Sequence, residues 1–211
     1  MRNAPGSYKR LSKATVGIAG AGGLGSNVAH LLARAGVGRL IIDDPDRIEL
    51  SNLGRQLYSI DQVGKPKVEV LKESLKNINP FIKIEIYKVK LDESNISTVF
   101  IGVDLLIEAL DSREGKRRLV KGFSKTYPEI PIIMASGLGG YGNNNKIKTR
   151  RVNDYIWVIG DFKTGPEHGL MTPRVCLVAA AQANLAVELL IEGPEVESIN
   201  PLRSVPIVGG G

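Results

Sequence analysis

A glycine-rich run at residues 20–25 constrains the fold of this chain more strongly than any other feature. The run reads Gly-Ala-Gly-Gly-Leu-Gly; an apolar segment precedes it at residues 15–20, and apolar side chains at helical spacing follow it. A second apolar segment comes next, at residues 39–43. This order of strand, glycine turn, helix and strand predicts a nucleotide-binding β-α-β unit.

The glycines and one acid of this unit have separate expected tasks. Gly20 permits the tight turn, Gly22 lets backbone N–H groups approach a phosphate, and Gly25 lets the helix pack closely on the strand. The N-terminus of that helix offers free donors and a positive dipole end to an anion. Asp44 ends the second strand and is the expected ligand of the ribose hydroxyls. The alternative is a tight turn that holds no ligand.

The rest of the chain predicts an α/β fold that is Rossmann-like, with a mostly parallel sheet, helices on both faces and a small antiparallel C-terminal extension. We expect one domain over residues 1–211, with an N-terminal arm at 1–13 and a tail at 193–211. The extension is a predicted hairpin of residues 146–151 and 155–159, followed by a loop. Further strands are expected at 82–89, 103–109 and 131–136, and further helices at 66–79, 94–101, 113–126 and 174–191.

The composition excludes several kinds of site. Cys176 is the only cysteine, so neither an internal disulfide nor a Cys-x-x-Cys zinc site can form, and no zinc is expected. The net charge is +6, but the aromatic fraction is 5% and does not interleave with basic residues, so nucleic acid is not an expected partner. We find no apolar run approaching the roughly 20 residues that span a bilayer. The N-terminus lacks a secretory signal, so no membrane partner and a cytoplasmic location are expected.

Three side chains after the second strand indicate a triphosphate. Asn52, Arg55 and Lys67 supply one amide and two cations. A nicotinamide cofactor carries only a pyrophosphate, whereas a triphosphate has roughly four negative charges that Arg and Lys are suited to neutralise. The same cations would stabilise a transition state at the α-phosphate. The alternative is that Arg55 and Lys67 are solvated surface charges.

Asp111 stands just beyond the expected strand at residues 103–109. Ligands of open parallel sheets bind at the carboxyl ends of the strands. A carboxylate there could hold Mg²⁺, which takes one or two carboxylates together with phosphate oxygens. The alternative role is the N-cap of the following helix, and both roles are compatible.

Five motifs, in this order, resemble those of the ThiF/MoeB/HesA family. The likeness runs from residue 15 to residue 191 and is closest to the short ThiF-type proteins, whose Gly-Leu-Met-x-Pro-Arg run is found at residues 169–174. The family is similar to the adenylation domain of ubiquitin-activating enzymes. The motifs are Gly-Ala-Gly-Gly-Leu-Gly at 20–25, Asp-Pro-Asp at 44–46, Ser-Asn-Leu-Gly-Arg-Gln at 51–56, Val-Gly-Lys-Pro-Lys at 63–67 and Ala-Leu-Asp at 109–111.

The resemblance implies an ATP-dependent adenylyltransferase. Its substrate would be the C-terminal Gly-Gly carboxylate of a ubiquitin-like sulfur carrier, ThiS-like and in thiamine-thiazole biosynthesis. The carboxylate attacks the α-phosphate, pyrophosphate leaves and an acyl-adenylate forms. A homodimer is also implied. The matching positions are Gly20, Gly22, Gly23 and Gly25 around ATP, Asp44 on ribose, Asn52, Arg55 and Lys67 on the phosphates, and Asp111 on Mg²⁺, with Arg55, Lys67 and Asp111 as the catalytic set.

The sequence departs from the family pattern in three ways. The two Cys-x-x-Cys pairs that many relatives use for structural zinc are absent. Cys176 lies on the last expected helix, where a small buried residue is the favoured interpretation, so a persulfide of another protein is expected to donate sulfur. Relatives supply an N-terminal Arg to the partner subunit's site, and Arg2 and Arg10 are the weak candidates here.

Alternative functions stay open at this point. A molybdopterin-type or other carrier would fit the same motifs. A nicotinamide-dependent dehydrogenase explains the glycine run and Asp44 but leaves Arg55, Lys67 and Asp111 without a task. A module that binds a nucleotide or a carrier without turnover is a third reading. The terminal Gly-Gly-Gly at residues 209–211 could enter a neighbouring site as a pseudo-substrate, although a disordered end is the simpler expectation.

Overall fold

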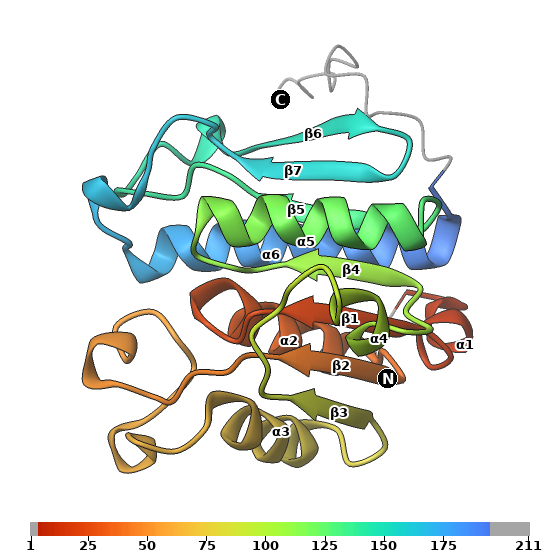
Figure 1. Ribbon diagram of the computed structural model, residues 1–211, viewed down its shortest axis with the longest axis horizontal. Coiled ribbons are helices and arrows are strands. Elements are labelled where there is room, and N and C mark those ends of the chain that lie inside the picture. Colours follow the sequence, from red (N-terminus) through yellow and green to blue (C-terminus); the bar gives the residue numbers. More distant parts are fainter. Residues whose placement is uncertain (1–3, 195–211) are drawn as a thin grey trace, which may run out of the picture.

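The computed structural model describes residues 4–194, which form a single twisted sheet with helices on both faces (Figure 1). The strand order is β3-β2-β1-β4-β5-β7-β6. Every pairing in the described sheet is parallel except that of β6 with β7. The strands are β1 (Thr15–Ala19), β2 (Arg39–Asp43), β3 (Lys83–Tyr87), β4 (Leu105–Glu108), β5 (Ile132–Ala135), β6 (Lys148–Asn153) and β7 (Ile156–Gly160).

The strand order places a switch point between β1 and β4. From β1 the chain moves outward through β2 and β3, then returns to the other side of β1 to form β4 and β5. The crossovers therefore diverge at the carboxyl ends of β1 and β4, which is where α/β sheets bind their ligands. The motifs at residues 20–25 and 109–111 directly follow these two strands, so the topology brings them together.

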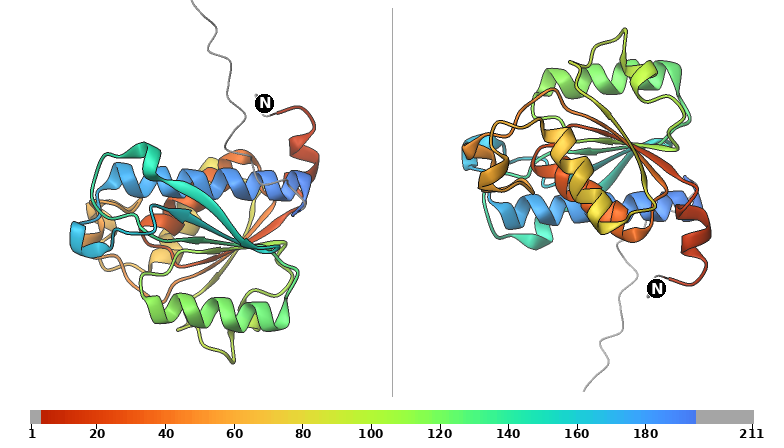
Figure 2. Two further views of the ribbon diagram at one scale, coloured as in Figure 1. Left: turned by 90° about the horizontal axis from the view of Figure 1, so that it is seen from above. Right: turned by 90° about the horizontal axis from the view of Figure 1, so that it is seen from below.

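Two apolar clusters hold the helices to the two faces of the sheet. Figure 2 shows α2, α3 and α6 on one face and α5 on the other. The first cluster joins α2, α3 and α6 to the sheet, and the second joins α4 and α5 to it. Each fully buried Leu, Ile or Phe in them contributes about 1.5–3 kcal/mol. The helices are α1 (Ser7–Leu11), α2 (Gly23–Ala35), α3 (Lys67–Ile78), α4 (Ile96–Val99), α5 (Arg113–Thr126) and α6 (Thr172–Glu192).

The predicted C-terminal extension is part of the main sheet. β7 lies parallel to β5, and β6 pairs with β7 at the edge, with all six of its residues exposed. The hairpin starts two residues later than expected, because a short 3₁₀ turn occupies Asn144–Lys146. The loop before α6 likewise contains a 3₁₀ turn, at Pro166–His168.

Helix α6 contradicts the expectation that no apolar segment of this chain is long enough to span a bilayer. It has 21 residues and a mean hydropathy of 1.7, so by length and composition alone it could cross a bilayer. Its buried side chains, among them Val175, Val178 and Leu189, belong to the main core, and the helix packs along α2. One side of α6 thus belongs to the core of the domain.

Candidate nucleotide and carboxylate-activation site

The glycine turn between β1 and α2 has the geometry that its sequence predicts. Gly20 has a φ of +101°, and a Cβ atom there would lie 2.6 Å from the carbonyl oxygen of Ala109. A Cβ atom on Gly25 would lie 1.8 Å from the carbonyl oxygen of Gly20. No side chain caps the N-terminus of α2 at Gly22, so its first backbone N–H groups face the carboxyl edge of the sheet.

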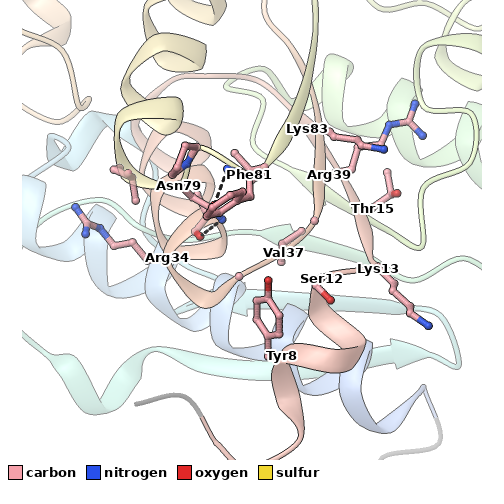
Figure 3. Close-up of a pocket in the computed structure, with 16 residues that line it drawn as sticks. Tyr8, Ser12, Lys13, Thr15, Arg34, Val37, Arg39, Asn79, Phe81 and Lys83 are labelled. Atoms are coloured by element: carbon pink, nitrogen blue, oxygen red, sulfur yellow. Dashed lines mark hydrogen bonds between the residues drawn. The ribbon is translucent and has the colours of Figure 1, made fainter. Parts of the chain in front are cut away.

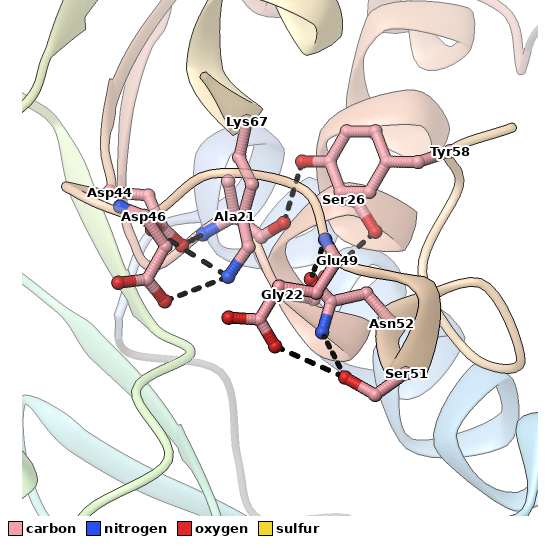
Figure 4. A network of polar contacts seen from close by, with 10 residues as sticks. All are labelled: Ala21, Gly22, Ser26, Asp44, Asp46, Glu49, Ser51, Asn52, Tyr58 and Lys67. Atoms are coloured by element: carbon pink, nitrogen blue, oxygen red, sulfur yellow. Dashed lines mark hydrogen bonds and ion pairs between the residues drawn. The ribbon is translucent and has the colours of Figure 1, made fainter. Parts of the chain in front are cut away.

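Asp44 lies next to this turn and is almost fully buried (Figure 4). Its Oδ2 accepts a 2.7 Å hydrogen bond from the Ala21 N–H, and its Oδ1 accepts a 2.8 Å bond from the Asp46 N–H. Burial raises the pKa of the Asp44 carboxyl, and these bonds together with Lys67 partly oppose that rise. The structure thus fixes the predicted ribose ligand at the mouth of the turn.

Lys67 begins α3 and is directed at the same acids. Its Nζ donates a 2.8 Å bond to Asp46 Oδ2 and lies 3.9 Å from Asp44 Oδ1. Only 7% of its side chain is exposed. The interpretation of Lys67 as a solvated surface charge is therefore wrong. Lys67 is instead held against two carboxylates at the carboxyl edge of the sheet, near the start of α2 (Figure 4).

The segment between β2 and α3 brings Asn52 and Arg55 to the start of α2. Asn52 is buried, and its Oδ1 accepts a 3.0 Å bond from the Glu49 N–H. Arg55 is half-buried and donates a 2.9 Å bond to the Ser51 carbonyl. Its Cγ would lie 3.5 Å from a Cβ atom on Gly23, so its stem runs along the first turn of α2.

Asp111 reaches the same edge from the other side of the switch point. It is exposed, and within residues 4–194 no hydrogen bond or ion pair engages its carboxylate. Ser112, not Asp111, caps α5: the Ser112 Oγ accepts a 3.0 Å bond from the Gly115 N–H. The N-cap alternative for Asp111 is therefore wrong, and its carboxylate is left for a ligand.

The donor set suits a magnesium ion bound largely through phosphates. Residues 4–194 contain no group of three or more His, Cys, Asp or Glu side chains that could hold a metal. Mg²⁺ does not need such a cage, because one or two carboxylates and substrate phosphate oxygens complete its octahedron. The free carboxylate of Asp111 fits that requirement.

A sequence model of the ThiF family matches residues 3–208. The chain belongs to the ThiF family. It is 41% identical over 109 residues to the sulfur carrier protein adenylyltransferase of Thermus thermophilus, covering 51% of this chain and 40% of that protein. It is 32% identical over 187 residues to the molybdopterin-synthase adenylyltransferase of Salmonella typhimurium, covering 85% of this chain and 74% of that protein. The chain thus spans less than half the length of the Thermus relative.

Solved structures show the same fold. The tRNA N6-threonylcarbamoyladenosine dehydratase TcdA of E. coli, solved in complex with ATP, superposes with a TM-score of 0.80 at 20% identity, covering 89% of both chains. E. coli MccB with ATP gives a TM-score of 0.70 at 23% identity over 87% of this chain and 57% of that one. At these identities the likeness establishes the ThiF-family fold alone.

Several residues of this ThiF-family site escaped the analysis of the sequence. The Tyr58 hydroxyl donates a 2.7 Å bond to the Ala21 carbonyl, and the Ser26 Oγ donates a 2.7 Å bond to the Gly22 carbonyl. Gln56 is buried, and its Oε1 has no partner among the described residues. Of these three residues, only Gln56 lies in a motif that the sequence analysis singled out. The contacts of Tyr58 and Ser26 form only in the folded turn, so the sequence does not indicate them.

The loop region after β5 is held by a buried ion pair. The Arg174 guanidinium in α6 contacts Asp161 Oδ2 at 2.5 Å and donates a 2.6 Å bond to the Gly142 carbonyl. Burial raises the pKa of Asp161, but the N–H groups of Thr164 and Lys163, the Thr164 hydroxyl and Arg174 together lower it to about 2. The Gly-Leu-Met-x-Pro-Arg run of this ThiF-family chain therefore anchors the glycine- and asparagine-rich loop.

Of the two candidates for the N-terminal arginine, the structure describes Arg10. Arg10, in α1, donates to the Ile191 carbonyl at the end of α6, so within one chain it is bound at the opposite end of the sheet. Arg2 and the terminal Gly-Gly-Gly lie outside the described residues.

Cys176 is half-buried rather than buried, and its Sγ contacts Asn27 Oδ1 at 3.5 Å.

A groove of about 770 Å³ lies at the amino ends of β1, β2 and β3. Figure 3 shows Tyr8 and Phe81 there among Lys13, Arg34 and other cations. It is far from the glycine turn, because parallel strands separate their amino and carboxyl ends. The groove therefore contains none of the expected nucleotide ligands, which lie at the carboxyl edge.

Proposed function

We propose that this chain binds ATP at the carboxyl edge of its sheet and adenylylates the C-terminal Gly-Gly carboxylate of a ubiquitin-like sulfur carrier. The observation that carries the proposal is the burial of Lys67 beside the uncapped start of α2, with the free Asp111 carboxylate across the switch point. A redox site needs neither group. A site that cleaves a nucleotide at its α-phosphate needs both charge neutralisation and a metal ligand.

Each site residue has a task in that reaction. Asp44 accepts the ribose hydroxyls, and the glycine turn receives a phosphate on the N–H groups of α2. Arg55, Lys67 and Asn52 contact the phosphates, where their donors match phosphate oxygens. Asp111 would hold Mg²⁺, which polarises the phosphate oxygens and neutralises their charge when bound.

The reaction balances without a protein nucleophile. A carboxylate oxygen of the carrier forms a bond to the α-phosphorus while the α–β bridging oxygen leaves with pyrophosphate. The products are an acyl-adenylate and pyrophosphate. Catalysis then consists of positioning and electrostatic stabilisation, which preorganised groups such as Lys67 supply without reorganisation.

The names of the relatives support a carrier as the substrate but differ in pathway. One is a sulfur carrier protein adenylyltransferase and another a molybdopterin-synthase adenylyltransferase, while a Bacillus subtilis relative is a tRNA threonylcarbamoyladenosine dehydratase. Within the proposal we favour a ThiS-like carrier, a homodimer, a cytoplasmic location and sulfur from another protein's persulfide. The run at residues 169–174 is the feature that favours the ThiS-like carrier.

Asp111→Ala tests the proposed metal ligand. We expect carrier-dependent ATP–pyrophosphate exchange to fall by about 100-fold or more, because transition-state charge loses its counterion. The matched control is Asp154→Ala, an exposed acid in the β6–β7 turn at the far edge of the sheet, which should leave exchange unchanged. Undiminished exchange in Asp111→Ala would contradict the assigned role.

A further inference from the structure

Glu108 is a buried carboxylate that the proposed reaction does not use directly. It is the last residue of β4 and has no exposed surface. The Lys116 Nζ donates 2.8 Å bonds to both of its carboxylate oxygens. Burial raises the pKa of the Glu108 carboxyl, and the Lys116 charge opposes that rise. A buried carboxylate at this edge of the sheet raises the question of which groups it binds and positions.

The pair joins four elements at the floor of the switch point. Lys116 comes from α5 and also donates a 3.3 Å bond to the Ala135 carbonyl at the end of β5. The Glu108 carbonyl accepts a 3.2 Å bond from Gln182 of α6, and Gln182 is itself fully buried. The carboxyl ends of β4 and β5 are therefore tied to α5 and α6 at one point.

The Glu108 carboxylate also fixes the chain that leads to Asp111. Its Oε1 accepts a 2.8 Å bond from the Leu110 N–H. The preceding residue, Ala109, donates a 2.9 Å bond to the Ala19 carbonyl, and its own carbonyl lies against Gly20. Residues 109 and 110 are thus held from both sides, so the next residue, Asp111, leaves the sheet in one direction.

Stability alone does not account for this pair. Replacing a buried ion pair by apolar groups of similar volume is often neutral or stabilising, because desolvation offsets the attraction between the charges. An ion pair at a functional edge is better explained by the geometry it imposes. Residues that orient a metal ligand change metal affinity or activity by about 10–100-fold when they are lost.

We propose that Glu108 and Lys116 form a positioning pair that aims the Asp111 carboxylate at the metal–phosphate group of the nucleotide. This inference rests on the proposed function of the site and adds two residues to it. Neither residue touches the nucleotide. Their effect passes through the Leu110 N–H and the backbone of residues 109–111.

The test compares three variants of the full chain. Lys116→Met keeps most of the length of the side chain but removes its charge, and Lys116→Arg keeps the charge. Lys121→Met is the matched control, since Lys121 lies on the same helix in a surface pair with Glu93 whose side chains are 69% and 63% exposed. All are measured at a temperature where circular dichroism shows each variant folded.

Three readouts separate positioning from stability. In Lys116→Met we expect amide exchange at residue 110, whose N–H is bonded to Glu108, to quicken. Mg²⁺ should increase the affinity for ATP by about 10–100-fold less than it does in the wild type. The kcat of ATP–pyrophosphate exchange should fall by a similar factor. ATP affinity without Mg²⁺ should change little. Lys116→Arg should restore all three readouts to near the wild-type values, and Lys121→Met should not differ from wild type.

The opposite pattern would overturn the inference. If Lys116→Met lowers the melting temperature but leaves the Mg²⁺ effect and kcat unchanged, the pair is structural only. A wild-type chain that binds ATP with Mg²⁺ yet shows no carrier-dependent exchange would instead contradict the proposed function. In that case amide exchange and the Mg²⁺ effect still decide the role of the pair.

Discussion

The two adjacent acidic residues at the end of β2, Asp43 and Asp44, have different environments. Asp44 faces the glycine turn, while its neighbour Asp43 points away and accepts a 3.1 Å bond from the Val89 N–H. Asp43 is 1% exposed. Burial, with a further contribution from the Asp44 charge, raises the pKa of Asp43 to about 7 against that bond. Adjacent positions at the end of β2 thus place one carboxylate at the glycine turn and the other in the protein interior.

The raised pKa of Asp43 predicts how stability changes with pH. The folded state holds the proton that the unfolded state releases near pH 4, so this group lowers the free energy of unfolding as pH rises from about 4 to about 7. We expect Asp43→Asn to flatten that slope, with a difference from wild type of up to about 4 kcal/mol across the window. Urea unfolding at a series of pH values measures it.

The control for this experiment is Asp154→Asn, because Asp154 is an exposed acid at the far edge of the sheet. It should keep the wild-type slope. A slope that is the same in wild type and Asp43→Asn would show that Asp43 does not titrate in this range.

At the residue level, sequence reasoning grouped residues correctly in space where a motif fixes the neighbours, while their roles stay predictions. The glycines, Asp44, Asn52, Arg55, Lys67 and Asp111 all reach the carboxyl edge of the sheet. It failed where a contact joins distant positions: nothing in the sequence predicts that Tyr58 bonds Ala21 or that Lys116 pairs with Glu108. It also treated Lys67 as a possible surface charge, because local sequence does not show that Asp44 and Asp46 fold over it.

Among the elements, the contact between β1 and α2 tolerates the least change. The helix can begin where it does only because residue 25 has no side chain facing the turn. The sequence predicted α2, β2 and α5 closely, and α2 and β2 are separated by glycines at residues 36 and 38. It placed the hairpin two residues early, because polar residues of an exposed edge strand such as β6 give no alternation of buried and exposed positions.

Gly25→Ala tests this contact. A methyl group there would lie 1.8 Å from the Gly20 carbonyl oxygen, so the helix must move. We expect the free energy of unfolding to fall by about 3 kcal/mol or more, outweighing the roughly 1 kcal/mol that Ala gains over Gly in a helix. Nothing lies within 4 Å of a Cβ atom on Gly54, so Gly54→Ala is the control and should shift stability by less than about 0.5 kcal/mol.

Equal urea midpoints for Gly25→Ala and wild type would mean that α2 is not held against the turn as the structure shows. ATP binding should weaken with stability in Gly25→Ala, because the first N–H groups of α2 move with the helix.

In the whole molecule, one sheet brings the site together from both sides of its switch point. Residues from the β1–α2 turn, the β2–α3 segment and the β4–α5 loop come to this edge because the chain, after β3, crosses to the other side of β1 to add β4. The sequence predicted the α/β class and the parallel sheet from alternating elements. It did not predict that the C-terminal hairpin joins the same sheet, because strand order depends on packing between distant segments.

The mass of the carrier protein after the reaction tests the proposed adenylylation most directly. Incubate the chain with ATP, Mg²⁺ and a purified ThiS-type carrier that ends in Gly-Gly, and record the intact mass of the carrier. We predict that the carrier gains the mass of one AMP with release of one pyrophosphate, and that it gains none with Asp111→Ala. A carrier of unchanged mass in the presence of wild-type chain that demonstrably binds ATP, or conversion of ATP to ADP and phosphate instead, would contradict adenylylation.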